Sequence, residues 1–406
     1  MSKRAVLWVA FVLVHVAVAV LGFLQPNQPM GDVYMVYEPW ASRAAAADGV
    51  VGITETWVYP ALALAPIFIT HVLAPVFGSY LVAWPVVVTA LDAAAFALLV
   101  GRGRSQGRAV AAWFWLVFIL ALGPVGMYRL DAITVPLAVA GCLWLLTRPR
   151  LAAVLLAAAT WIKVWPAALL VAAVIAVRRR LALVGGAAAL SALVIGVVVA
   201  VGGAAHLFGF VFDQTERGLQ VEAPVSAFWL WRAVAGFADS RVFYDDEILT
   251  WQVTGPGAAA VSEAMTAVMV AAVALVAAIG ALRVRRGIPF LRVFPALALS
   301  LVLVFIVTNK VGSPQYLTWI IAPLVVGLVL DRDRWWSPAC LALVSAALTQ
   351  LIYPLWYDRV LGGDPIAVGA LTLRNVLLVA LLAWSVTLLV RTPRRVPAPA
   401  VVDALA

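Results

Sequence analysis

The feature that most constrains this chain is a succession of uncharged apolar runs, each about as long as a bilayer is thick. Of the 406 residues, 65% are hydrophobic and 12% are charged, whereas a soluble domain has about 45–50% apolar and about 25% charged residues. A membrane-spanning helix needs about 20 consecutive apolar residues. The sequence therefore excludes a soluble globular fold and predicts an all-α, polytopic transmembrane helical bundle.

We expect about twelve spans, which would place both termini on one side of the membrane. Two stretches are ambiguous: 59–77, which contains Pro60, Pro66 and Pro75, and 151–177, which could form one long helix or two short ones. The other expected spans follow the apolar runs directly. The full set of predicted spans is 5–24, 79–100, 109–125, 131–147, 151–162, 164–177, 181–201, 258–282, 289–308, 316–330, 337–355 and 373–390.

The positions of Lys and Arg decide between these alternatives, because cations near helix ends collect on the cytoplasmic side. If 59–77 lies at the surface and 151–177 forms a hairpin, 19 of the 28 cations fall inside and 9 outside. If both stretches span once, 15 fall inside, 12 outside and Lys163 lies within the membrane. The first split is the more asymmetric, so we adopt the hairpin. On this topology 15 of the 19 acidic residues face outward, and the extracytoplasmic face is expected to carry the chemistry.

This topology predicts a multi-pass protein of the cell membrane, a single domain over 1–406 with cytoplasmic termini and a cytoplasmic tail over 391–406. The net charge of +9 comes from short basic clusters between apolar runs. That pattern indicates membrane orientation and not a nucleic-acid partner. Cys142 and Cys340 both lie in apolar segments, so their spacing supports neither a disulfide framework nor a metal site. The run 5–24 lacks a small-residue cleavage site and is expected to be retained as the first helix.

Two predicted outer loops, 25–78 and 202–257, are far longer than the usual connection of about 2–8 residues between helices. In the first loop, helix-breaking prolines and Gly31 precede Asp32, and tyrosines and tryptophans follow it. Such aromatics prefer the headgroup zone, so we expect Asp32 at the boundary between lipid and water. The stretches 36–47 and 59–77 suit helices that lie along the interface.

The second loop contains FDQTERGLQVEAPVSAFWLW and, later, DSRVFYDDEILTW. Its first half mixes acids, Arg217 and glutamines ahead of an aromatic helix, as expected of a cap over a cleft. Its second half includes Asp245, Asp246 and Glu247. We interpret these carboxylates as a solvated surface, because three adjacent acids without a histidine or a returning ligand are a weak signal for a divalent cation.

Four cations can be gathered around one outer cavity: Arg129, Lys163, Arg217 and Lys310. Charges at bilayer depth are costly and normally face a bundle interior or a cavity. Lys163 is the sharpest case, because two half-length helices that meet at a lysine expose polar backbone to a ligand. A phosphate at the membrane surface suits such a cavity, since Arg binds its oxygens bidentately and Lys supplies a point charge.

The remaining polar residues in or near the apolar runs are interpreted as structural and not as part of a site. Arg359 and Arg374 are expected to extend toward the headgroups. His15 is expected to be a satisfied helix residue, and Asp92 to be hydrogen bonded within the bundle, with a proton relay as the alternative reading. No GxSxG, HExxH, P-loop or GxGxxG pattern is present, which argues against a serine hydrolase, a zinc protease and an ATP-driven pump.

The chain resembles the GT-C membrane glycosyltransferases in a series of short motifs in order along the chain. These motifs are GDVYMVY with Asp32, WVYPALALAP, an RLD turn, WIKVWP, RGLQVE and SPQYLTW. The most similar family is glycosyltransferase family 87, the polyprenyl-phosphate-mannose-dependent mannosyltransferases of actinobacteria. The resemblance implies inverting transfer of a sugar from a polyprenyl-phosphate donor, with an aspartate of the first outer loop as general base. Asp32 is the matching residue.

The same chemistry follows from what the transfer needs. A carboxylate within about 3 Å of an acceptor hydroxyl can take its proton, and cations stabilise the charge that develops on the leaving phosphate. We therefore expect Asp32 to be catalytic, and Arg129, Lys163 and Lys310 to bind the donor phosphate. The residues expected to bind the substrates are Tyr34, Tyr59, Asp131, Arg217, Gln220, Glu222, Gln315 and Tyr316. Asp131 is expected either to orient Arg129 or to act directly.

The expected partners are a polyprenyl-phosphate sugar, a glycolipid or polysaccharide acceptor and membrane lipids, with no nucleic acid, no metal and no cofactor. The resemblance implies that the sugar is mannose. One alternative is a flippase or transporter of lipid-linked sugars, which would carry polar residues through the bundle to the inner face. In this sequence only His15 and Asp92 lie deep. A second alternative is a noncatalytic subunit, which would be expected to lack the base.

Overall fold

The computed structural model describes residues 2–212, 217–246 and 248–391, and 76% of the chain is helical. Among the described residues, eight helices are long and apolar enough to cross a membrane. Two of them extend into a tighter or wider turn. The long helices are α1 (Lys3–Leu24), α4 (Tyr80–Val100), α5 (Gln106–Leu122) with η3 (Gly123–Gly126), α9 (Arg180–Ala200), α12 (Ala258–Arg285), α13 (Phe290–Val307), α15 (Arg332–Gln350) with η7 (Leu351–Leu355), and α17 (Pro365–Val390).

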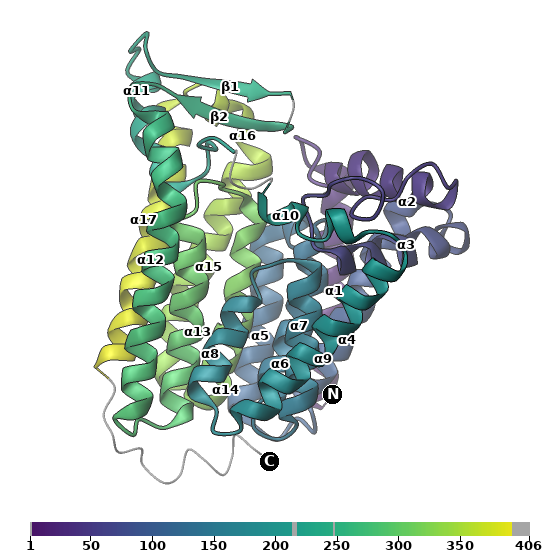
Figure 1. Ribbon diagram of the computed structural model, residues 1–406. Helices are drawn as coiled ribbons and strands as arrows, with labels where there is room; N and C mark the ends of the chain where they lie inside the picture. Colours follow the sequence, from purple (N-terminus) through teal and green to yellow (C-terminus); the bar gives the residue numbers. More distant parts are fainter. Residues whose placement is uncertain (1, 213–216, 247, 392–406) are drawn as a thin grey trace.

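Four shorter apolar helices complete the bundle. They coincide with the remaining predicted spans, whereas the number of twelve crossings and the cytoplasmic position of the termini stay predictions. The start of α1 and the end of α17 lie at the same end of the bundle (Figure 1). The shorter helices are α6 (Leu130–Trp144), α7 (Pro149–Ile162), α8 (Ala167–Ala176), and η6 (Pro314–Ile320) continued by α14 (Ile321–Leu330).

The ambiguous stretch 151–177 is a helical hairpin, as the charge distribution predicts. Helix α7 ends at Ile162, Lys163 is extended with φ −154° and ψ 136°, and α8 begins at Ala167. The arginines before α7 and after α8 line the same hollow, so the two helices run in opposite directions. Pro166 favours the break, because a proline has no N–H to donate to the carbonyl four residues earlier, which is that of Ile162.

The first long loop folds into an arm beside the bundle (Figure 1). It contains a π-helix, η1 (Asp32–Tyr37), followed by α2 (Glu38–Ala45), and then η2 (Ala61–Ala63) with α3 (Leu64–Phe77). Helix α3 packs against α2 and α4, and Phe68, Ile69 and Val72 on its other side are exposed. Both expected interfacial segments are thus helical, although α2 begins two residues later than predicted.

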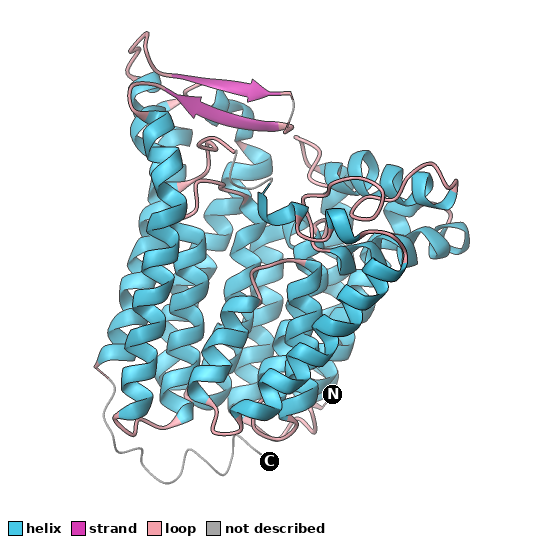
Figure 2. Cartoon of the chain, viewed as in Figure 1, coloured by secondary structure: helices cyan, strands magenta, loops and turns pink. Residues whose placement is uncertain are grey.

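The second long loop contains the one feature that an all-α prediction misses. A two-stranded antiparallel hairpin, β1 (Arg241–Asp245) and β2 (Thr250–Thr254), pairs Phe243 with Gln252 (Figure 2). The strands are rich in Val, Phe, Tyr, Thr and Trp, which favour extended backbone. The loop also holds η4 (Ala204–His206), α10 (Gly209–Phe212), η5 (Pro224–Ser226) and α11 (Ala227–Val234), and α16 (Tyr357–Leu361) follows η7.

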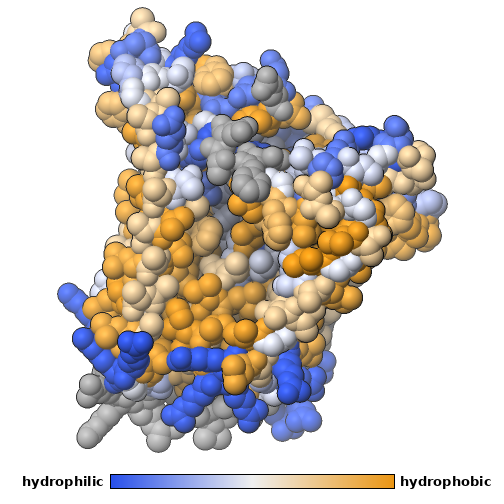
Figure 3. Space-filling view, in the orientation of Figure 1, coloured by the Kyte–Doolittle hydropathy of each residue, from blue (hydrophilic) through white to orange (hydrophobic). Residues whose placement is uncertain are grey.

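The surface has an apolar middle between polar ends (Figure 3). Helices α1, α9 and α12 present many exposed apolar side chains, including Leu13, Leu193 and Leu275, as expected of helices that face lipid. The basic clusters gather at the end where α7 begins and α8 ends (Figures 1 and 3). The predicted tail 391–406 lies outside the described residues except for Arg391.

His15 and Arg374 are both buried and each has a carboxylate partner. His15 Nε2 is 3.0 Å from Asp92 Oδ2, and His15 Nδ1 is 2.9 Å from the carbonyl oxygen of Phe11. His15 is therefore satisfied and Asp92 is hydrogen bonded within the bundle, as predicted, although Asp92 Oδ1 is buried without a hydrogen-bond partner among the described residues. The expectation that Arg374 extends to the headgroups is wrong. Arg374 is buried and its Nη2 is 3.2 Å from Glu222 Oε2, because a carboxylate 152 residues away in sequence compensates its charge.

Candidate functional site

Asp32 begins the π-helix η1, and this conformation determines which residue accompanies it. A π-helix brings residues five apart onto one face. Tyr37, five residues after Asp32, points its hydroxyl at Asp32 Oδ2 at 3.4 Å and accepts a hydrogen bond from the Leu130 backbone at 3.3 Å. Asp32 Oδ1 makes no hydrogen bond to any residue in the described part of the chain, and the side chain is 33% exposed. One oxygen is therefore available to a substrate.

Arg129 holds the other oxygen of Asp32. Its Nε lies 3.2 Å from Asp32 Oδ2, and its side chain is only 7% exposed. Nη1 donates to the backbone carbonyls of Pro29 and Tyr128, and Nη2 lies 3.4 Å from the Tyr353 hydroxyl. A guanidinium has five N–H donors, so about one remains for a ligand. The geometry makes Arg129 chiefly a positioning residue for Asp32.

Asp131 and Lys163 form a second pair two residues along from Arg129. Lys163 Nζ is 2.7 Å from Asp131 Oδ2, and Trp319 Nε1 donates to Asp131 Oδ1 at 2.5 Å. Asp131 is fully buried and both its oxygens are occupied. It orients Lys163 and not Arg129, the residue that the sequence suggested. Lys163 uses one of its three N–H donors in this pair, which leaves two for an anion.

Aromatic rings surround the second pair. Lys163 Nζ lies 5.1 Å from the centre of the Tyr59 ring, within the range of a cation–π interaction. Tyr316 stacks on Trp319 at 4.1 Å between ring centres, and Trp165 also stacks on Trp319, at 5.8 Å. Trp165 and Trp319 are buried, whereas Tyr59 and Tyr316 are half-buried. The rings of these two tyrosines, beside a cation and a carboxylate, are the apolar faces suited to a sugar or a lipid headgroup.

We call Asp32, Arg129, Asp131 and Lys163 the carboxylate–cation cluster. It is recessed because the helices that carry it are short: α6, α7 and α8 have 15, 14 and 10 residues, whereas α12 has 28. At 1.5 Å per residue, α8 is far shorter than α12, and Figure 1 shows the turn between α7 and α8 below the top of α12. Figure 3 shows the same face hollowed at this level. The basic clusters lie at the opposite end.

Residues of the second loop lie beside this recess. The Gln220 backbone donates to the carbonyl of Lys310 at 3.0 Å, and the buried Glu222 pairs with Arg374. Burial raises the pKa of Glu222 to about 7, although the guanidinium of Arg374 opposes this rise. The charge of Arg217 is close enough to influence Tyr59 and Tyr316. Residues 213–216 of the predicted cap lie outside the described residues.

The described contacts of Tyr34, Gln315 and Lys310 do not include the cluster. Tyr34 donates to Gln28 at 2.6 Å and faces away from Asp32 in the π-helix. Gln315 contributes its backbone carbonyl to Thr318. Burial lowers the pKa of Lys310, and the charge that opposes this is Glu263 of α12. The Lys310 backbone is linked to Gln220.

Sequence reasoning missed Tyr37, Tyr353 and Trp319, each of which contacts the cluster. Tyr353 lies in the second π-helix, η7, and its hydroxyl also donates to the carbonyl of Asn27 at 3.0 Å. The predicted span 337–355 coincides with α15 and η7, which together are long enough to cross a membrane, but the helix is kinked at Tyr353, whose backbone is extended with φ −131° and ψ 121°. The IYPLWY sequence before α16 contains a proline that could have indicated this kink.

No group of three His, Cys, Asp or Glu side chains able to hold a metal occurs within the described residues. Asp245 accepts hydrogen bonds from Ile248 and Gln252, and Glu247 of the same acidic patch lies outside the described residues. Comparison of the chain with protein-family models, with curated proteins and with solved structures finds no match.

Proposed function

We propose that this protein is an integral membrane glycosyltransferase that moves a sugar, by the family resemblance mannose, from a polyprenyl-phosphate donor to a lipid or glycan acceptor. The observation that carries the proposal is the asymmetry of Asp32. One of its oxygens is held by Arg129, and the other is free in a recess that also contains Lys163. A carboxylate held in this way can accept a proton without losing its position.

In the proposed reaction, Asp32 Oδ1 takes the proton of the acceptor hydroxyl. The acceptor oxygen attacks the anomeric carbon, and the bond between that carbon and the phosphate oxygen breaks with inversion. The electron pair leaves with the polyprenyl phosphate, whose growing negative charge is stabilised by the free N–H groups of Lys163. The half-buried ring of Tyr316, which stacks on the buried Trp319, offers a face for the sugar.

The proposal also includes the location of the reaction. The cluster and the arginine-rich helix ends lie at opposite ends of the bundle. Because Lys and Arg favour the cytoplasmic side, the cluster belongs on the extracytoplasmic face of the cell membrane. Nucleotide sugars are not available there, so a sugar already carried on a membrane lipid is the suitable donor.

The test is transfer by the purified full-length protein in detergent micelles, with polyprenyl-phosphate mannose and a membrane lipid extract, and product identification by mass. We expect Asp32→Asn to reduce turnover by about 10²–10⁴-fold, the usual range for loss of a general base. Asp48→Asn is the matched control, because Asp48 lies exposed in the same loop. Undiminished turnover by Asp32→Asn would remove Asp32 as the base.

A further inference from the structure

Five arginines surround one hollow at the end of the bundle opposite the carboxylate–cation cluster. The hollow has a volume of about 980 Å³ and lies between the start of α7, the end of α8 and the start of α9. We call these arginines the basic pocket: Arg148, Arg150, Arg178, Arg179 and Arg180. No acidic residue lines the pocket, and none of the five forms an ion pair within the described residues.

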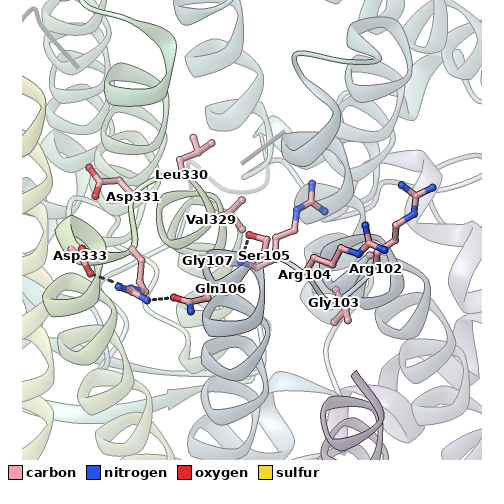
Figure 4. A pocket seen from close by; sticks show the side chains of 14 residues that line it. Arg102, Gly103, Arg104, Ser105, Gln106, Gly107, Val329, Leu330, Asp331 and Asp333 are labelled. Atoms are coloured by element: carbon pink, nitrogen blue, oxygen red, sulfur yellow. Dashed lines mark hydrogen bonds and ion pairs between the residues drawn. The ribbon is translucent and has the colours of Figure 1, made fainter. Parts of the chain in front are cut away.

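A second hollow at the same end of the bundle contains arginines that do have carboxylate partners. It has a volume of about 670 Å³ and contains both arginines and aspartates (Figure 4). Arg332 Nε is 3.0 Å from Asp333 Oδ1, and Asp331 pairs with Arg292. The basic pocket therefore differs from its neighbour in concentrating positive charge without internal carboxylates.

The positive-inside tendency alone does not account for this arrangement. Orientation requires only that cations lie near the ends of helices, and it does not require five of them to converge on one concavity. Like charges at close range repel one another. A multiply hydrogen-bonding anion would relieve that repulsion, and arginine binds phosphate oxygens bidentately.

The surroundings of the pocket indicate which anion fits. Leu181 and Leu151 line the same hollow and are 88% and 38% exposed. Only 17% of the apolar stretch of α9 is buried, so α9 presents an open apolar side next to the arginines. Arg148 lies 5.3 Å from the centre of the Trp144 ring, and tryptophan prefers the membrane interface. The pocket thus joins a cationic concavity to an apolar surface.

We propose that the basic pocket binds the headgroup phosphate of an anionic phospholipid, whose acyl chains lie beside Leu181 and the exposed side of α9. Basic pockets between helices at membrane depth are a common means of binding anionic lipid headgroups. This inference is independent of the proposed transferase activity, because the two sites are at opposite ends of the molecule.

The test is native mass spectrometry of the full-length protein in micelles, titrated with phosphatidylglycerol or with phosphatidylcholine of the same acyl chains. We expect preferential binding of phosphatidylglycerol. Arg178→Gln with Arg179→Gln should weaken that binding by roughly 25-fold, because each arginine near a membrane surface contributes about a fivefold factor. Arg102→Gln with Arg104→Gln is the matched control, since it removes the same charge from the neighbouring hollow.

Two further experiments ask whether the pocket binds a lipid or a soluble phosphate, and whether net charge alone explains the binding. Glycerol phosphate and inorganic phosphate should compete with phosphatidylglycerol only weakly, because neither contacts the apolar side. Equal competition would overturn the assignment to a lipid. The double variant Arg178→Lys with Arg179→Lys keeps the positive charge and the membrane orientation of the protein. It should retain part of the preference for phosphatidylglycerol over phosphatidylcholine. An equal loss in the 178/179 and 102/104 glutamine variants would show that net charge, not the basic pocket, attracts the lipid.

Discussion

The two aspartates of the carboxylate–cation cluster differ in how fully their oxygens are hydrogen bonded. Asp131 is buried and satisfied on both oxygens by Lys163 and Trp319. Asp32 is satisfied on one oxygen and partly exposed. A residue that must accept a proton from a substrate needs an accessible oxygen. In the proposed transfer, Asp131 is therefore a positioning residue and Asp32 is the general base.

Lys163 serves both stability and, in our proposal, donor binding, and a pair of variants can separate the two. Lys163→Ala leaves the buried Asp131 without its cation, so we expect a loss of about 3–5 kcal/mol in the free energy of unfolding. The double variant Lys163→Met with Asp131→Asn removes both charges and keeps an acceptor for Trp319, so most of the stability should return. Thermal unfolding in micelles measures this difference.

The double variant should recover stability but not the binding of the donor. In the double variant, we expect the KM for polyprenyl-phosphate mannose to stay raised while the KM for the acceptor changes little. Recovery of the donor KM in the double variant would mean that Lys163 acts only through the structure of the turn.

Because the pKa of Glu222 is raised in the folded protein, we expect the stability of the protein to depend on pH. Burial raises its pKa to about 7 in the folded protein from an ordinary value near 4.5. The folded state then binds the proton more tightly than the unfolded state, so this contribution to stability is fully present below about pH 4.5 and is lost as the pH rises through 7. We expect the midpoint of thermal unfolding to fall between pH 5 and pH 8.

The variant Glu222→Gln should remove this component, because an amide does not ionise, while Asp48→Asn should retain it. An identical decline in unfolding midpoint for wild type and Glu222→Gln would exclude Glu222 as its source.

At the scale of elements, the site depends on interruptions in helices. The π-helices η1 and η7 present Tyr37 and Tyr353 to the cluster, and the break at Lys163 separates α7 from α8. Short helices leave a recess that long ones would fill. Interrupted helices are expected where a polar site must lie at membrane depth, because irregular backbone is tolerated there only inside protein or beside water.

The second loop is fixed to the bundle by a close backbone contact at Gly312. A Cβ atom at this position would lie 2.2 Å from the backbone nitrogen of Ala223. We expect Gly312→Ala to displace the segment around Glu222, to cost roughly 1–3 kcal/mol of stability, and to increase proteolysis of the loop. Gly185→Ala is the control, since nothing lies within 4 Å of its Cβ position and alanine favours a helix interior. Equal resistance to proteolysis would contradict the contact.

The apolar runs predict the long helices within a few residues, because a helix must satisfy its backbone hydrogen bonds wherever it meets lipid. The apolar runs cannot predict which side chain of another helix or loop will pair with a given charged residue. Arg374 looks isolated in its helix, and its partner Glu222 is distant in sequence. Asp32 and Lys163 are recognisable as candidates, but the partners that orient them are fixed by packing between α6, η1 and η6. The hairpin β1–β2 was missed because acidic residues obscured its β-favouring pattern.

In the molecule as a whole, the basic clusters lie at one end of the bundle and the recess with the carboxylate–cation cluster lies at the other. The basic pocket and its neighbouring hollow share the end where α1 begins. The carboxylate–cation cluster lies toward the other end, beside the arm formed by α2 and α3. Such a polarity suits an enzyme that is oriented by its cations and receives lipid-linked substrates on the face away from them.

Accessibility to a membrane-impermeant thiol reagent tests this polarity. Cys142 is buried and Cys340 half-buried, and both can first be changed to Ala to give a background without thiols. In intact cells, Asp48→Cys near the cluster should be labelled, whereas Gln106→Cys at the arginine-rich end should be labelled only after permeabilisation. Both positions are exposed, so reactivity reports sidedness and not burial. Labelling of Gln106→Cys in intact cells, with protection of Asp48→Cys, would place the cluster on the cytoplasmic side, where soluble nucleotide sugars are present and a lipid-linked donor is no longer required.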